Sequence, residues 1–137
     1  MDEPINLVLF SGTDDKLQAA AVLTAGAAAL GKPVNVFLQY WALDAFRRER
    51  IDRDHGLAPE AGAEGRDHVD TLRERGQVSW AETFRQVKEL GTVDIQACSL
   101  SMDLLGLEED GLDSLVDGVE GVTAFYLNAG NGQVVFI

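Results

Sequence analysis

The feature that most limits the possible folds is the apolar run Ile5–Phe10, which is followed directly by an alanine-rich segment. The run is rich in β-forming residues and its apolar and polar positions do not alternate, which is typical of a strand buried on both faces of a parallel sheet. The alanine-rich segment has helical character to about Leu30, and Gly31 and Pro33 are well suited to end it. The chain therefore begins with a strand that is followed by a helix.

Four later segments are also predicted to be strands. They are Pro33–Tyr40, Val93–Ala97, Gly121–Leu127 and Gln133–Ile137. Helical segments separate most of them, and this alternation indicates an α/β fold with a mainly parallel sheet of about five strands and right-handed crossovers. The turn Asn128–Gly132 would join the last two strands like a hairpin, which would place an antiparallel strand at one edge of the sheet.

The residue spacing predicts several more helices, in which apolar residues recur on one face. The clearest signal is at Trp80–Leu90, where Ser79 and Glu82 match the capping box that begins many helices. The other predicted segments are a short amphipathic helix over Trp41–Phe46 with Trp41, Leu43 and Phe46 as candidate anchors, a short helix that begins at Ser99 or Leu100, and a helix over Leu107–Val116.

Residues 47–77 differ in character from the rest of the chain. They hold seven of the eleven basic residues, both histidines and few large apolar residues, with one short helix predicted near Asp67–Arg75. Segments of this length with little regular structure are usually either mobile or lids over a site. We therefore predict a single domain over 1–137 in which 47–77 forms a mobile or lid-like excursion, and the sequence leaves the choice between the two open.

The charge balance and the single cysteine limit which partners the protein can bind and in which cell compartment it is expected. A formal net charge of −12 would repel nucleic acid and anionic membrane surfaces, so we expect neither as a partner. Acids are densest over 102–120, which holds seven acids and no base.

The longest apolar stretch, Ala19–Leu30, is too short to span a bilayer, and Met1–Pro4 is acidic where a signal peptide would be basic. A lone cysteine cannot form an internal disulfide, and we expect a cytoplasmic protein.

Cys98 stands at the end of a predicted strand, with a helix predicted directly after it. The first turn of a helix presents unpaired N–H groups and a partial positive charge, which favour a thiolate over a thiol. Asp103, one turn into that helix, opposes the formation of a thiolate. Free cysteines are also often small, buried apolar residues. The sequence therefore leaves a reactive and a structural role for Cys98 open.

Loops at the carboxyl ends of parallel strands meet at one edge of a sheet, where ligands bind. Three loops of this chain would meet there, and Cys98 is the strongest nucleophile among their residues. Ser99 and Ser101 could hold a bound sulfur atom or an oxyanion, although helix capping alone would also explain them. The predicted site comprises Cys98 and the pocket-lining residues Ser11, Gly12, Lys16, Trp41, Ser99, Ser101 and Met102.

Other kinds of site find no support in the sequence. The segment Ser11–Lys16 lacks the second glycine of a phosphate-binding loop, and its first turn is acidic. His55 and His68 lack the spacing of metal ligands, and neither is in a predictable position to activate the cysteine as in a cysteine hydrolase. We therefore expect no metal and no cofactor.

Several motifs together resemble those of a known family. They are Ser11-Gly12 with Asp15-Lys16, Gly31-Lys32-Pro33-Val34 after the alanine-rich helix, Trp41-Ala42-Leu43, Val116-Asp117-Gly118-Val119, and above all Ala97–Gly106 around the cysteine. On these residues the chain resembles the DsrE/DsrF-like sulfur-relay family, in particular the small proteins often labelled DsrE-like or peroxiredoxin-like. The resemblance spans most of the chain except Arg47–Gln77.

This resemblance implies a flavodoxin-like three-layer α/β sandwich, which is frequently homo-oligomeric. It also implies a cysteine that carries sulfane sulfur as a persulfide and exchanges it with a TusA-like carrier or a rhodanese-like partner. That role maps onto Cys98 only. Some relatives have a second cysteine, and its absence here argues against peroxidase chemistry with an internal resolving thiol.

Three hypotheses for function follow. The leading one is a cytoplasmic sulfur carrier or sulfurtransferase in which Cys98 accepts sulfane sulfur. The second is a non-enzymatic oligomeric binding or assembly module in which Cys98 is a packed core residue. The third is a thiol redox sensor in which Cys98 forms a sulfenic acid or an intermolecular bridge.

Overall fold

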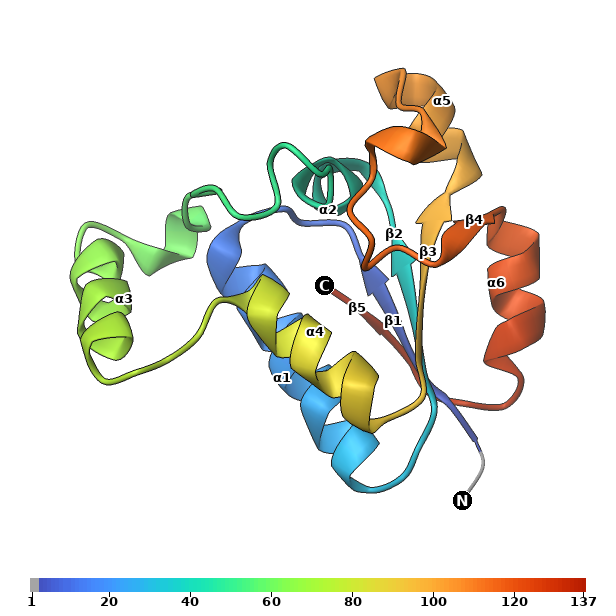
Figure 1. Ribbon diagram of the computed structural model, residues 1–137, viewed down its shortest axis with the longest axis horizontal. Helices are drawn as coiled ribbons and strands as arrows, with labels where there is room; N and C mark the ends of the chain where they lie inside the picture. Colours follow the sequence, from blue (N-terminus) through green and yellow to red (C-terminus); the bar gives the residue numbers. More distant parts are fainter. Residues whose placement is uncertain (1–2) are drawn as a thin grey trace.

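A five-stranded parallel sheet with strand order β4-β3-β2-β1-β5 forms the centre of the protein (Figure 1). The computed structural model describes residues 3–137, so Met1 and Asp2, the first residues of the acidic N-terminus, lie outside the described residues. The strands are β1 (Ile5–Leu9), β2 (Val34–Leu38), β3 (Val93–Cys98), β4 (Gly118–Glu120) and β5 (Val134–Phe136). The helices are α1 (Asp14–Ala29), α2 (Tyr40–Ala45), α3 (Gly65–Glu74), α4 (Trp80–Leu90), α5 (Ser99–Leu105) and α6 (Val122–Ala129), with single turns η1 (Pro59–Ala61) and η2 (Glu109–Gly111). The predicted α/β sandwich is confirmed.

Two strand predictions near the C-terminus are wrong. The segment predicted as the strand Gly121–Leu127 forms α6, and the fourth strand is β4, just before it. The buried positions of α6 are Phe125 and Ala129, four residues apart, which is the spacing of a helix and not of a strand. The last strand is not antiparallel either. Helix α6 carries the chain from β4 at one edge of the sheet to β5 at the other, so β5 pairs with β1 in parallel.

The helix predicted over Leu107–Val116 does not form, because within these residues only the single turn η2 is regular. Backbone hydrogen bonds fasten this loop to the segment after α2, from Arg48 N to Gly111 O (2.9 Å) and from Asp113 N to Phe46 O (2.9 Å). Leu112 and Leu115 are nevertheless buried, as the apolar spacing had indicated.

The remaining helix predictions agree closely with the structure. In α4, the Ser79 hydroxyl accepts a hydrogen bond from the Glu82 backbone N–H (3.1 Å), the main contact of the predicted cap. Helix α5 begins at Ser99. Leu43 of α2 and Phe46, the residue directly after it, are fully buried anchors, but Trp41 is 56 % exposed and is not an anchor.

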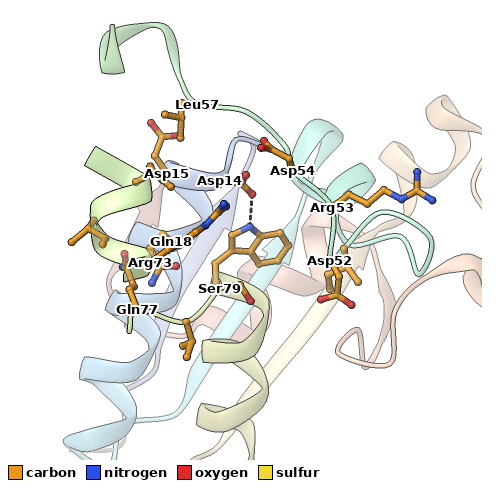
Figure 2. Close-up of a pocket in the computed structure, with 15 residues that line it drawn as sticks. Asp14, Asp15, Gln18, Asp52, Arg53, Asp54, Leu57, Arg73, Gln77 and Ser79 are labelled. Carbon is orange, nitrogen blue, oxygen red and sulfur yellow. Dashed lines mark hydrogen bonds between the residues drawn. The ribbon is translucent and has the colours of Figure 1, made fainter. Parts of the chain in front are cut away.

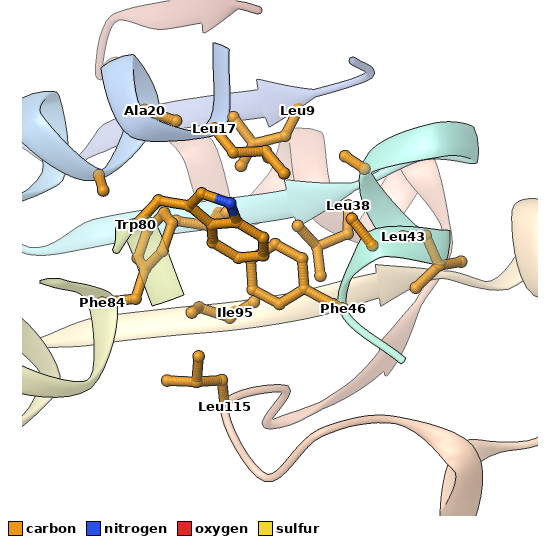
Figure 3. Packing of buried hydrophobic residues seen from close by; sticks show 14 of the residues in the cluster. Leu9, Leu17, Ala20, Leu38, Leu43, Phe46, Trp80, Phe84, Ile95 and Leu115 are labelled. Atoms are coloured by element: carbon orange, nitrogen blue, oxygen red, sulfur yellow. The ribbon is translucent and has the colours of Figure 1, made fainter. Parts of the chain in front are cut away.

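One face of the sheet is covered by α1 and α4, and the main core lies beneath them (Figure 3). Alternate residues of β1, β2 and β3 point into this layer, where Phe46, Trp80 and Phe84 form an aromatic group with ring centroids 5.1–6.4 Å apart. Fully burying each large apolar side chain contributes about 1.5–3 kcal/mol. The small residues of α1 permit a close approach to α4, since a β-carbon on Gly91 would lie only 2.8 Å from Ala28 Cβ.

Helix α6 lies on the opposite face of the sheet from α1 and α4 (Figure 1). Beneath it a second, small cluster forms from Phe37, Cys98 and Phe125, with Val8 packed against it. The Phe37 and Phe125 rings are stacked with centroids 4.9 Å apart. Buried Asn6 ties this layer together, because its amide donates to Gln133 O (3.1 Å) and to Ala129 O (3.3 Å) at the end of α6.

Residues 47–77 leave the sheet after α2 and return at α4. They contain η1 and α3, and α3 lies close to the helix predicted near Asp67–Arg75. The segment is fastened to the start of α1, since Asp14 accepts from His55 N (2.9 Å) and Asp15 accepts from Ala58 N (3.1 Å). Figure 1 shows α3 at the far side of α1, standing out from the rest of the protein.

Candidate functional site

The carboxyl ends of the strands place several of the predicted site residues at one edge of the sheet, where α2 and α5 lie side by side (Figure 1). The loop after β1 is in tight contact with the loop after β2, because a β-carbon on Gly12 would lie 2.3 Å from the Trp41 carbonyl oxygen. The loop after β2 is joined to α5 by a hydrogen bond from Tyr40 N to the Ser101 hydroxyl (3.1 Å). Three loops distant in sequence therefore form one connected edge.

Cys98 is the last residue of β3 and the residue before α5. Its side chain points to the α6 face of the sheet and is only 4 % exposed. The thiol is therefore positioned at the sheet edge, as predicted from the sequence, but it lies beneath Phe125 rather than in an open pocket. Helix α5 has seven residues and carries no acid in its first turn.

Tyr40 has an unusual backbone conformation at this edge. Its φ of +45° lies in the left-handed region, which is uncommon for residues other than glycine. Such strain persists only where the surroundings fix it. Here the fixing contacts are the hydrogen bond to fully buried Ser101 and the packing of the Tyr40 ring on Phe10, with centroids 5.1 Å apart.

An aromatic row continues from Tyr40 in both directions along the edge. The ring centroids of Phe10 and Phe136 of β5 are 5.9 Å apart, and those of Tyr40 and Trp41 are 6.0 Å apart. Of these four residues only Trp41 is among the predicted site residues. The sequence does contain a pattern that could have indicated this row, because an aromatic residue stands at or just beyond the end of each of three strands. The order of the strands brings these aromatic residues together, and that order is set by tertiary structure.

Glu120 is a second residue that the sequence did not single out. It is paired with Cys98 in the register of β3 and β4, so both side chains stand on the same face of the sheet. Burial raises the pKa of the Glu120 carboxyl above its ordinary value, and the Asp94 carboxylate adds to the rise. A hydrogen bond from Asn128 of α6 (3.3 Å) partly offsets these effects. When ionised, this carboxylate opposes a thiolate on its neighbour.

Glu120→Gln should be more stable than the wild type at neutral pH. A raised pKa in the folded state means that the folded protein holds the Glu120 proton more tightly than the unfolded chain does. The stability from this proton is therefore present below the unfolded value of 4.5 and is lost as pH rises through the folded pKa. Urea unfolding from pH 4 to 8 should show the two proteins converging at low pH and diverging above it. A difference that does not vary with pH, or the same divergence for the exposed Glu109→Gln, would contradict this account.

The structure disperses the other predicted residues. Met102 is buried in the main core, on the other side of the sheet from Cys98, and Ser101 is buried against Tyr40. Ser99 Oγ lies beside Gly121 at the start of α6, and Ser11 Oγ is 3.3 Å from Thr13 Oγ1. Lys16 forms an ion pair with Glu60 of the excursion (3.7 Å) and lies near Phe136 and Ile137, at the carboxyl end of β5.

A separate hollow of about 700 Å³ lies on the α1 and α4 side of the sheet (Figure 2). We call it the α3 hollow, because its walls are the inner side of α3, the first turns of α1 and α4, and the excursion between them. Its lining residues are Asp14, Asp15, Gln18, Ile51, Asp52, Arg53, Asp54, Leu57, Val69, Leu72, Arg73, Gln77, Val78, Ser79 and Trp80. The hollow does not include Cys98, so the protein presents two distinct candidate sites.

The fold and the cysteine edge define a small parallel α/β protein with a single thiol at the carboxyl end of its third strand. The model of the DsrE/DsrF/DrsH-like family matches residues 1–137, and the chain belongs to this family.

A curated relative and two solved structures are similar along nearly the whole chain. The chain is 28% identical to the uncharacterized protein YrkE of Bacillus subtilis (strain 168), over 93% of this chain and 92% of that protein. The fold is similar to that of the protein of unknown function MTH1491 from Methanobacterium thermoautotrophicum, with a TM-score of 0.61, 14% identity and coverage of 99% and 100% of the two chains. It is likewise similar to the ychN protein from E. coli, with a TM-score of 0.59, 15% identity and full coverage of both chains.

Across residues 3–137, none of the helices combines the length and the apolar character needed to cross a membrane.

Proposed function

We propose that the protein is a cytoplasmic sulfur carrier or sulfurtransferase that holds sulfane sulfur as a persulfide on Cys98. The observation that supports this most directly is the position of the only cysteine of a DsrE/DsrF/DrsH-like chain, at the carboxyl end of β3, on the ligand-binding edge of the sheet. The family connects the chain with sulfur relay, and this residue is the one in the sequence able to form a persulfide.

The transfer step requires a thiolate and a persulfide donor. The Cys98 sulfur attacks the terminal sulfur of the donor, the donor's S–S bond breaks, and the donor leaves as a thiolate that takes up the proton released by Cys98. No net oxidant is needed, because one persulfide replaces another. Delivery to an acceptor such as a TusA-like or rhodanese-like protein is the same step in reverse order. Ser99 and the backbone near Ser11 and Gly12 are the proposed polar neighbours of the outer sulfur, with Lys16, Ser101 and Met102 supporting the edge and Trp41 beside its opening.

Cys98→Ser should abolish sulfur loading while the fold is retained. Intact-mass spectrometry after incubation with polysulfide should show a gain of roughly 32 Da per chain on the wild type, removed by dithiothreitol, and none on the variant. Circular dichroism of both proteins checks the fold, and Ser114→Ala, a change at an exposed position in the loop before β4, serves as the control that keeps the thiol. Equal mass gain in Cys98→Ser would rule out the proposal.

One observation favours a second candidate, a binding or assembly module in which Cys98 is structural. Cys98 is 4 % exposed and packs with two phenylalanine rings. In that case a thiol reagent should label the denatured protein rapidly and the native protein slowly, and polysulfide should add no mass to the native wild type. Fast native labelling would instead show that the cover over Cys98 opens.

We further propose that the protein is a homo-oligomer that associates through the α6 face. Residues 121–137 contain no charged side chain, although a quarter of the chain is charged and its net charge is −12. On this side of the sheet the apolar residues Val122, Tyr126, Leu127, Val134 and Phe136 are exposed. Copies that repel one another elsewhere can approach closely at this uncharged face.

A further inference from the structure

Helix α3 is amphipathic, but its apolar side is not packed against the body of the protein. Val69 and Leu72 share one side of the helix, and both line the α3 hollow. Leu72 remains 44 % exposed, and Gly65 is the buried residue of the helix. An apolar helix side normally gains its stability by burial, so this one is left without its usual partner within the described chain.

The opposite wall of the hollow is also apolar and is rigid. Ile51 and Trp80 are almost completely buried and belong to the main core. The Trp80 indole N–H donates to Asp14 (2.8 Å), which fixes the orientation of its ring (Figure 2). A volume of about 700 Å³ between two apolar walls falls in the range of small-molecule sites, which is about 300–1,000 Å³. An apolar body placed there would cover Leu72 and Val69 against Trp80.

The polar lining carries a surplus of negative charge. Asp14, Asp15 and Asp54 stand at the hollow, whereas Asp52 is paired with Arg85 (3.3 Å), and Figure 2 shows the Arg53 side chain directed away. Arg66 is paired with Asp54 (3.2 Å), and Arg73 supplies one positive charge against the two remaining carboxylates, Asp14 and Asp15. The surplus therefore favours a positively charged occupant and disfavours an anion.

Neutral donors hold the three carboxylates in place, and within residues 3–137 neither Asp14 nor Asp15 forms an ion pair. Asp14 accepts from Trp80 Nε1 and from His55 N (2.9 Å), Asp15 accepts from Ala58 N (3.1 Å), and Asp54 accepts from Gly56 N (2.7 Å). Arg66 at 3.2 Å from Asp54 is the one ion pair on this set. An ionised carboxylate can accept about four hydrogen bonds, so each keeps room for a ligand N–H. Within residues 3–137 no three acids, histidines or cysteines come together as a metal site.

We propose that the α3 hollow binds a small organic cation with an apolar body, such as an arylalkylamine. The ammonium group would lie near Asp14 and Asp54, and the apolar body would lie between Trp80 and the Val69–Leu72 side of α3. This site is on the opposite side of the sheet from the Cys98 side chain and does not depend on sulfur transfer. In this proposal, the excursion 47–77 forms one wall of the binding site.

Two probes of the same shape and opposite charge test the proposal. Trp41→Phe leaves Trp80 as the only tryptophan, so its fluorescence reports on the hollow. Titration with 2-phenylethylamine at pH 7 should give a saturable change, confirmed by calorimetry, and 3-phenylpropionate should bind at least about tenfold more weakly, the equivalent of about 1.4 kcal/mol. Equal binding of the two probes, tighter binding of the acid, or binding of neither would overturn the proposal.

Variants of the two kinds of contact locate the binding. Asp54→Asn removes one carboxylate charge, and Leu72→Ser removes an exposed apolar contact that the fold does not need, so each should weaken binding of the amine about fivefold or more. Asp110→Asn and Leu104→Ser make the same changes at exposed positions on η2 and α5, outside the hollow, and should leave it unchanged. If the controls weaken binding as much as the hollow variants, the amine binds elsewhere and the proposal fails.

Discussion

Gly12→Ala is expected to destabilise the protein by about 3 kcal/mol, at the upper end of the usual range for overpacking. The added β-carbon would lie 2.3 Å from the Trp41 carbonyl oxygen and 2.8 Å from its carbonyl carbon. These are backbone atoms at the start of α2, next to Tyr40, whose strained conformation is fixed by contacts on both sides. The loops after β1 and β2 therefore cannot separate without disturbing the edge that holds Cys98.

The measurement is urea unfolding of Gly12→Ala beside Gly26→Ala. Gly26 lies in the middle of α1, and a β-carbon there would meet nothing within 4 Å. Its replacement by alanine should therefore stabilise the protein, by about 0.5–1 kcal/mol, because alanine is the better helix former. Opposite signs for the same chemical change would show that the close approach of two loops, and not chain entropy, makes Gly12 necessary. If Gly12→Ala lowers the free energy of unfolding by less than about 1 kcal/mol, the two loops can move apart easily and the prediction is wrong.

The α/β architecture could be predicted because its signals are local. The β-forming residues of β1, β2 and β3 and the Ser79 cap of α4 are each contained within a few residues. The segment after β4 could not be assigned in this way. An apolar run of seven residues fits a strand or a buried helix equally well, and it is the packing of Phe125 on Phe37 and the connection to the far edge that decide for α6.

For the candidate site, the sequence predicted the position of Cys98 at the end of a strand and nothing finer. Cys98 lies at the carboxyl end of β3 because strand direction alone places it there. Its side chain stands on the α6 face because residues alternate along β3 and Ile95 and Ala97 point into the main core. Glu120 stands beside it because of the register of β3 with β4, which leaves no mark in the sequence. The α3 hollow depends on how far α3 stands from α1, and no periodicity within either helix sets that distance.

Leu127→Asp is expected to convert the wild-type oligomer into a monomer. Leu127 is 77 % exposed on α6, and Phe136, 65 % exposed on β5, stands on the same side of the sheet. Covering such side chains contributes about 25 cal/mol for each Å² of apolar surface removed from water, so several of them together can outweigh the repulsion between two acidic chains. A carboxylate placed in the middle of this uncharged face would be buried without a partner on association, at a cost of several kcal/mol.

Light scattering coupled to size-exclusion chromatography measures the result directly. The wild type should have at least twice the chain mass of 14.8 kDa, and Leu127→Asp should have the mass of one chain with an unchanged circular dichroism spectrum. Leu90→Asp is the matched control, since Leu90 is even more exposed (87 %) but lies at the end of α4 on the opposite face, and this variant should remain oligomeric. A monomeric wild type would contradict the proposed interface. Dissociation by Leu90→Asp but not by Leu127→Asp would move that interface to the α1 and α4 face, and α6 would then need a partner other than a second copy of the chain.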